Sequence, residues 1–167
     1  MGFMGSGKST LGQSLSEHLG LPFTDLDRLI ESSAGKSIPQ IFSEMGEPAF
    51  REMESESLKR VLVKPAQVIA IGGGAPCRED HIRLIRERST SVYLKISVEE
   101  LFNRLWEQSP GRPLIAGKSP QELRTFIASL LRAREPYYTQ ANIILESDCL
   151  TAEELLQALL PGSGVRV

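Results

Sequence analysis

The sequence predicts an α/β fold with a mainly parallel sheet, and two observations carry this prediction. Short apolar segments typical of buried strands alternate with amphipathic helical patterns along the whole chain, an order that indicates parallel strands joined by helices. Glycines and acids follow these strands, at the sheet edge where such folds bind ligands. The length of 167 residues fits one domain. We expect that domain over residues 1–160, with a flexible tail at 161–167.

The expected helices and strands follow from the spacing of apolar residues and from the glycines and prolines between them. The first helix is expected at 8–19, where Leu11, Leu15 and Leu19 form one stripe and Gly20 provides the stop. The run QVIAIGGG is apolar on consecutive positions, which suits a parallel strand covered on both faces. Further helices are expected at 26–33, 38–45, 48–63, 79–88, 98–107, 120–134 and 152–160. The other strands lie in LPFTDLD, TSVYLKI and ANIILES, and the glycine- and proline-rich stretch at about 107–120 reads as a loop.

Composition excludes several classes of function. The net charge is -2, so nothing indicates a nucleic-acid or acidic-membrane surface. The two cysteines, Cys77 and Cys149, lie outside any metal-ligand spacing, and a zinc site is not expected. No apolar run approaches the length of a membrane span, and no signal segment precedes the first helix. We therefore expect a cytoplasmic protein.

The segment from Gly2 to Ser9 matches the phosphate-binding pattern G-x-x-x-x-G-K-[ST]. Its glycines allow successive backbone N–H groups to point at phosphate oxygens, and the following helix adds its positive end. Lys8 would neutralise the β- and γ-phosphates, and the Ser9 hydroxyl would hold Mg²⁺. The alternative is a glycine-rich turn with a solvated lysine.

Two acids and three glycines follow the next strands. Asp25 and Asp27 lie two apart, so their side chains share one side of an extended segment. One can orient Mg²⁺ and the other can hold an attacking hydroxyl, whereas the alternative is a helix cap. The triplet in GGGAP, centred on Gly73, would let backbone N–H groups approach a ligand closely.

Three arginines complete the set of candidates. Arg51 has Glu54 one helical turn away, which by itself favours a surface ion pair. Arg134 lies near a helix end, where a cation is favourable in any case. Arg112 lies in the glycine- and proline-rich loop, where it could stabilise a transferred phosphoryl group or remain a solvated charge.

These motifs together resemble shikimate kinase over nearly the whole chain, from Gly2 to about Leu160. The resemblance rests on the order and spacing of GFMGSGKST, FTDLD, IFSEMGEPAFREMES, IGGGA, RPLIAG and REPYY. It implies a three-layer P-loop kinase fold with sheet order 2-3-1-4-5. It also implies transfer of the γ-phosphoryl group of ATP to the 3-hydroxyl of shikimate, in aromatic amino acid biosynthesis, by what we expect to be a monomer.

The resemblance also implies roles for single residues. The ATP phosphates would be held by Gly5, Ser6, Gly7, Lys8, Ser9 and Thr10. Ser9 and Asp25 would bind or support Mg²⁺, and Asp27 would bind the shikimate hydroxyls as the candidate base. Arg51 and Arg134 would clamp the shikimate carboxylate, which planar guanidinium groups suit better than lysine. The Gly73 backbone would contact the substrate, and Arg112 would reach ATP from a closing loop. Arg104 or the segment ESDCLTAEE would lie near adenine.

The chain departs from the resemblance at its start. Family members carry a hydrophobic strand before the phosphate loop, in the middle of the sheet, where this chain has only Met1. The strands at VIAI and VYLKI should then each present an unpaired edge to a gap. We expect that the reading frame was begun at an internal Met, with natural truncation as the alternative.

Two other functions compete with this interpretation. Another small P-loop kinase, acting on gluconate or a nucleoside monophosphate, would share the phosphate loop, but the RPLIAG motif together with Arg51 and Arg134 argues against it. A truncated, inactive nucleotide-binding protein would share it too, but every catalytic residue type is present.

Overall fold

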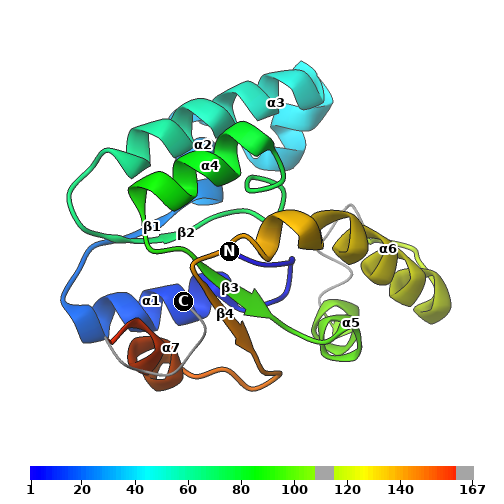
Figure 1. The fold of residues 1–167 in the computed structure, drawn as a ribbon. Coiled ribbons are helices and arrows are strands. Elements are labelled where there is room, and N and C mark those ends of the chain that lie inside the picture. The colour runs from blue at the N-terminus through cyan, green and yellow to red at the C-terminus, as the bar shows by residue number, and fades with distance from the viewer. Residues whose placement is uncertain (108–114, 161–167) are drawn as a thin grey trace.

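The structure is a computed structural model that describes residues 1–107 and 115–160. Helices and strands alternate along the chain, as predicted (Figure 1). The helices are α1 (Lys8–Leu19), α2 (Leu26–Ala34), α3 (Ile38–Leu62), α4 (Glu79–Arg88), α5 (Val98–Glu107), α6 (Pro120–Tyr138) and α7 (Ala152–Leu159). The strands are β1 (Phe23–Asp25), β2 (Val68–Ala70), β3 (Val92–Lys95) and β4 (Ile143–Glu146). Within the described residues, no helix is both long and apolar enough to span a membrane.

The four strands form two separate parallel pairs. β1 pairs with β2, with Phe23 opposite Val68, and β3 pairs with β4, with Val92 opposite Ile143. Within the described part of the chain, no backbone ladder joins β2 to β3. Within these residues the two pairs therefore do not form one continuous sheet.

Helices cover both sides of these strands. In Figure 1, α2, α3 and α4 lie above β1 and β2, while α1 and α7 lie below the strands. One core cluster, which includes Leu26, Ile41 and Leu58, fills the upper side. A second, around Leu101 and Leu123, packs α5 against α6, and a third joins α1 and α7 to β3. This three-layer arrangement is the predicted one.

One predicted helix boundary is confirmed and another is wrong. The expected helices at 38–45 and 48–63 share the label α3, but Gly46, with the non-helical φ of 82° and ψ of 169°, separates them at a kink. The helix expected at 120–134 continues through Pro136 to Tyr138. The prediction that it stops near Pro136 was wrong, because a proline can lie in the last turn of a helix where few bonds are lost.

Met1 pairs with β3 through two backbone hydrogen bonds. Its amino group donates to the carbonyl oxygen of Val92, and its own carbonyl accepts the N–H of Leu94 at 2.9 Å. The chain then turns at Gly2 into the phosphate-binding loop. One end of the gap between β2 and β3 is thereby occupied, and the remainder is a groove.

Candidate active site

The loop from Gly2 to Lys8 has the curled backbone that its motif predicts. Gly5 and Gly7 adopt φ of 81° and 86°, a left-handed region that favours glycine, and Gly7 is the N-cap of α1. Lys8 Nζ donates to the carbonyl of Phe3 at 2.7 Å. The buried Ser6 hydroxyl has no hydrogen-bond partner among the described residues. Backbone donors at a helix N-terminus, a lysine and an unsatisfied hydroxyl fit a polyphosphate group.

Asp25 ends β1 and performs two tasks. Its Oδ1 accepts the N–H groups of Asp27 and Arg28, which caps α2, and its Oδ2 accepts the Ser9 hydroxyl at 2.6 Å. The capping alternative is therefore confirmed, and it coexists with the contact to Ser9. Together the two side chains offer oxygen ligands beside the loop, the kind that Mg²⁺ prefers while it keeps several waters and phosphates. Among the described residues, no cluster of three or more His, Cys, Asp or Glu side chains could hold a metal.

Asp27 is the most perturbed carboxyl group of the site. Burial, followed by the charges of Asp25 and Glu54, raises its pKa from 3.8 to about 6, although Lys8 acts in the opposite direction. A carboxylate whose pKa is moved towards neutrality is suited to accepting a proton from a hydroxyl. This supports the prediction that Asp27, rather than Asp25, faces the substrate.

The glycine triplet lies against three predicted substrate-binding side chains. A Cβ atom added at Gly72 would lie 2.6 Å from Oδ1 of Asp27. One added at Gly73 would lie 3.1 Å from Nη1 of Arg134, and one at Gly74 would lie 2.9 Å from Nη1 of Arg51. Each glycine thus permits the close approach of one charged group. Asp27 from α2, Arg51 from α3 and Arg134 from α6 therefore converge on one short turn.

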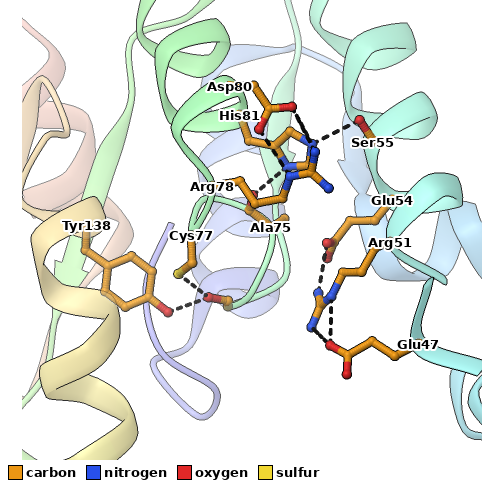
Figure 2. Close-up of polar contacts among 11 residues, drawn as sticks. Glu47, Arg51, Glu54, Ser55, Ala75, Cys77, Arg78, Asp80, His81 and Tyr138 are labelled. Atoms are coloured by element: carbon orange, nitrogen blue, oxygen red, sulfur yellow. Dashed lines mark hydrogen bonds and ion pairs between the residues drawn. The ribbon is translucent and has the colours of Figure 1, made fainter. Parts of the chain in front are cut away.

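The guanidinium of Arg51 is held by two acids on its own helix (Figure 2). Nη1 donates to Glu54 at 2.9 Å, while Nε and Nη2 donate to Glu47 at 3.1 and 3.0 Å. The Glu54 side chain is only 3% exposed, whereas that of Glu47 is 62% exposed. The ion pair expected from the sequence is thus present, and its buried half orients the guanidinium towards the glycine triplet.

Two contacts that the sequence did not predict hold the glycine turn. The Tyr138 hydroxyl donates to the Gly73 carbonyl at 2.6 Å, because α6 continues past Pro136 (Figure 2). His81, which is 1% exposed, bonds Ala75 O through Nδ1 at 2.7 Å and Ser55 Oγ through Nε2 at 3.0 Å. Since a carbonyl only accepts, Nδ1 carries the proton, and the Ser55 hydroxyl donates to Nε2. The REPYY motif includes Tyr138 and could have drawn attention to it. Nothing in the sequence indicated that His81, a single histidine on a helix, supports the glycine turn.

A cavity of about 580 Å³ brings the phosphate loop and the acids together. It is lined by residues 4–5 and 7–11, by Asp25 and Asp27, by residues 70–73, and by Arg104 and Leu150. Its size falls within the range of small-molecule sites. The predicted residues Gly5, Gly7, Lys8, Ser9, Thr10, Asp25, Asp27 and Gly73 all lie on it. Arg51 and Arg134 lie beside its glycine edge.

The other predicted cations have different positions. Arg104 lines the cavity and donates to the carbonyls of Gly5 and Asp148, at 3.3 and 2.5 Å. It therefore links the phosphate loop to the segment after β4, the two places considered for adenine. Arg112 lies outside the described residues.

Sequence comparison identifies the family. A sequence model described as "Shikimate kinase" matches residues 4–161. The chain belongs to the shikimate kinase family. Shikimate kinase from Parabacteroides distasonis is 44% identical over 153 residues, which cover 92% of this chain and 88% of that protein. Shikimate kinase from Chlorobium limicola is 43% identical over 168 residues, which cover 95% of this chain and 84% of that protein.

Solved structures agree with this membership. The crystal structure of shikimate kinase from Bacteroides thetaiotaomicron has a TM-score of 0.89 at 39% identity, covering 95% of this chain and 93% of that one. Shikimate kinase from Acinetobacter baumannii, solved in complex with shikimate, has a TM-score of 0.83 at 35% identity. The match covers 93% of this chain and 86% of that one. The resemblance to shikimate kinase, and the α/β fold that it implied, are confirmed.

Proposed function

We propose that this chain transfers the γ-phosphoryl group of ATP to the 3-hydroxyl of shikimate. The observation that carries the proposal is the convergence of Asp27, Arg51 and Arg134 on the glycine triplet. A carboxylate substrate with neighbouring hydroxyls matches two guanidinium groups and one aspartate. The phosphate loop on the same cavity would supply the donor nucleotide.

The residues divide the reaction between them. The loop residues Gly5 to Thr10 would hold the triphosphate, with Lys8 neutralising its charge. Arg51 and Arg134 would bind the carboxylate and thereby place the hydroxyl beside Asp27. Phosphoryl transfer has a loose transition state, so orientation of the hydroxyl contributes more than early removal of its proton. Asp27 would accept that proton as the bond forms.

Mg²⁺ fits the oxygen pair of Ser9 and Asp25, and when bound it would neutralise charge on the phosphates. Both residues would hold it, Ser9 directly and Asp25 directly or through water. We further propose, from the family resemblance, that Arg112 reaches ATP, that the chain is a cytoplasmic monomer of one domain, and that it binds no nucleic acid.

An acceptor panel tests the proposal. ADP release should be measured with shikimate, gluconate or AMP as acceptor, with water alone as the background. Shikimate should increase the rate well above background, and the other two should not, because the ring of shikimate fixes its carboxylate and its 3-hydroxyl at one separation, which neither an open-chain sugar acid nor a nucleotide reproduces. Stimulation by gluconate or AMP equal to that by shikimate would overturn the substrate assignment.

A second function is a nucleotide-binding protein without turnover. The groove between β2 and β3 favours it, because the loop that holds the phosphates begins at an incompletely paired edge. ATP binding measured by calorimetry, together with background ADP release for every acceptor, would support it.

A further inference from the structure

A buried histidine that the proposed reaction does not use lies behind the glycine turn. His81 on α4 is 1% exposed, so its imidazole reaches no ligand directly. Nδ1 donates to the carbonyl oxygen of Ala75 at 2.7 Å, and Nε2 accepts the hydroxyl of Ser55 on α3 at 3.0 Å. One side chain thus joins the end of the turn to the helix that carries Arg51 (Figure 2).

The turn is held at each of its carbonyl groups. Those of the first and third glycines of the triplet accept backbone N–H groups three residues further along the chain, at 3.1 and 3.0 Å. The Gly73 carbonyl accepts the Tyr138 hydroxyl, so α6 fixes the middle of the turn. The Ala75 carbonyl accepts His81, so α4 fixes its end. Of these contacts, the one through His81 continues to α3.

The segment of α3 that His81 contacts carries the ion pair that orients Arg51. Ser55 directly follows Glu54, whose carboxylate accepts Nη1 of Arg51 at 2.9 Å. Both Ser55 and Glu54 are buried. The bond from Ser55 to His81 therefore sets where this segment lies relative to the glycine turn, and Glu54 transmits that position to the guanidinium.

The spacing between Arg51 and the turn leaves little tolerance. A Cβ atom added at Gly74 would lie 2.9 Å from Nη1 of Arg51, so the guanidinium packs directly against the turn. A guanidinium fork binds a carboxylate through two parallel hydrogen bonds, and such arrangements function only when they are held to within about 0.5 Å. The path of contacts through His81 and α3 returns to the same turn, so the bond to Ser55 contributes to that accuracy.

We propose that His81 is a positioning residue for the acceptor substrate, because it holds α3 at the spacing from the glycine turn at which Arg51 binds the substrate carboxylate. This role rests on the proposed function of the same site. His81 acts on shikimate binding rather than on ATP binding, since its two contacts join α3 to the glycine turn and leave out the phosphate loop. A histidine that only stabilised the fold would leave both KM values unchanged when it was replaced.

Two substitutions remove the same bond from opposite ends. Ser55→Ala deletes the hydroxyl, whereas His81→Asn keeps an amide N–H for Ala75 but is too short to reach Ser55. Each should raise the shikimate KM about 3- to 10-fold, as expected for one neutral hydrogen bond, and leave the ATP KM within about twofold. Because both changes remove one bond, the double variant should lose no more than either single variant. Steady-state kinetics of the three variants and the unmodified protein measures these values.

A matched control separates positioning from stability. Ser91 is 6% exposed against 9% for Ser55, and its hydroxyl donates to Asn142 at 2.8 Å, far from the glycine turn in the chain. Ser91→Ala should lower the midpoint of thermal unfolding about as much as Ser55→Ala, without a change in the shikimate KM.

The outcomes distinguish this role from the proposed function. If the unmodified protein phosphorylates shikimate but Ser55→Ala and His81→Asn keep its KM for shikimate, the positioning role of His81 is wrong and the proposed function stands. An equal rise in the ATP KM, additive losses in the double variant, or an equal rise in the shikimate KM for Ser91→Ala would overturn the role as well. If the unmodified protein does not phosphorylate shikimate, the proposed function fails and the role fails with it.

Discussion

The carboxyl ends of the strands and the centre of the sheet differ sharply in how completely they are built. At the carboxyl ends, the glycine triplet meets side chains from α2, α3 and α6. The Asp25 carboxylate and the Gly73 carbonyl both have hydrogen-bond partners there. At the centre, β2 and β3 face a groove in which Met1 provides only a one-residue pairing. The side chains of the site are thus positioned by helices and by the glycine turn. The pair β1–β2 is connected to the pair β3–β4 mainly through the phosphate loop.

The site also contains a carboxyl group whose charged form is disfavoured. Burial and the neighbouring charges raise the pKa of Asp27 to about 6. Since a base of near-neutral pKa accepts protons well, this cost would accompany a chemical use.

The largest effect is expected from Asp27→Asn. The amide keeps the size of the side chain but cannot accept the proton, so kcat should fall by about 10²- to 10⁴-fold. ATP affinity, measured by calorimetry, should change little. The control is Glu99→Gln, an exposed acid on α5 that pairs with Arg124, and it should leave kcat unchanged. If the Asp27→Asn variant kept a near-normal kcat, the raised pKa of Asp27 would have no catalytic role.

Arg51→Lys should separate substrate binding from nucleotide binding. Lysine keeps the charge but loses the planar fork and the simultaneous contacts to Glu54 and Glu47, so the shikimate KM should rise by roughly 10- to 100-fold. The ATP KM should stay within about twofold, since the guanidinium lies at Gly74 rather than at the phosphate loop. The matched control is Arg60→Lys, on the same helix but outside the cavity. Equal losses for both substrates would count against the assignment.

The smallest effects are expected from removing the hydroxyl group of Tyr138 or of Tyr93, two tyrosines whose ring centroids lie 5.0 Å apart. Tyr138→Phe removes the bond to the Gly73 carbonyl and should destabilise the protein by about 1 kcal/mol, with a small rise in the shikimate KM. Tyr93→Phe removes a buried hydroxyl that has no partner among the described residues, and it should be neutral or stabilising. Thermal unfolding of both variants measures the difference. Equal destabilisation would mean that the bond to Gly73 contributes nothing specific.

Local patterns predicted most of the fold. The helix α1 and the strand before the glycine triplet were evident from spacing, because the periods of helices and buried strands are set by local geometry. The cap at Asp25 was considered only as an alternative. The end of α6 was not, since a proline usually stops a helix and only the packed position of Tyr138 shows that this one continues. The break predicted between two helices, in contrast, corresponds to the kink at Gly46 within α3.

The site was predicted in its residues but not in its supports. Asp27, Arg51 and Arg134 came from motifs that lie far apart in the sequence, and the structure brings all three to the glycine triplet. The pair of Arg51 and Glu54 was evident from its spacing on one helix, but the bonds of Tyr138 and His81 to the glycine turn depend on how α4 and α6 pack. Such contacts have no local signature, because they arise only when helices from distant segments meet.

Identification of the product tests the central claim most directly. The protein should be incubated with equal concentrations of ATP and shikimate, with Mg²⁺, and the products followed by phosphorus NMR. The account predicts that each ADP formed is matched by one phosphate monoester on the 3-hydroxyl of shikimate, and that Asp27→Asn suppresses both signals together. ADP accompanied by inorganic phosphate instead, at a rate unaffected by shikimate, would contradict it.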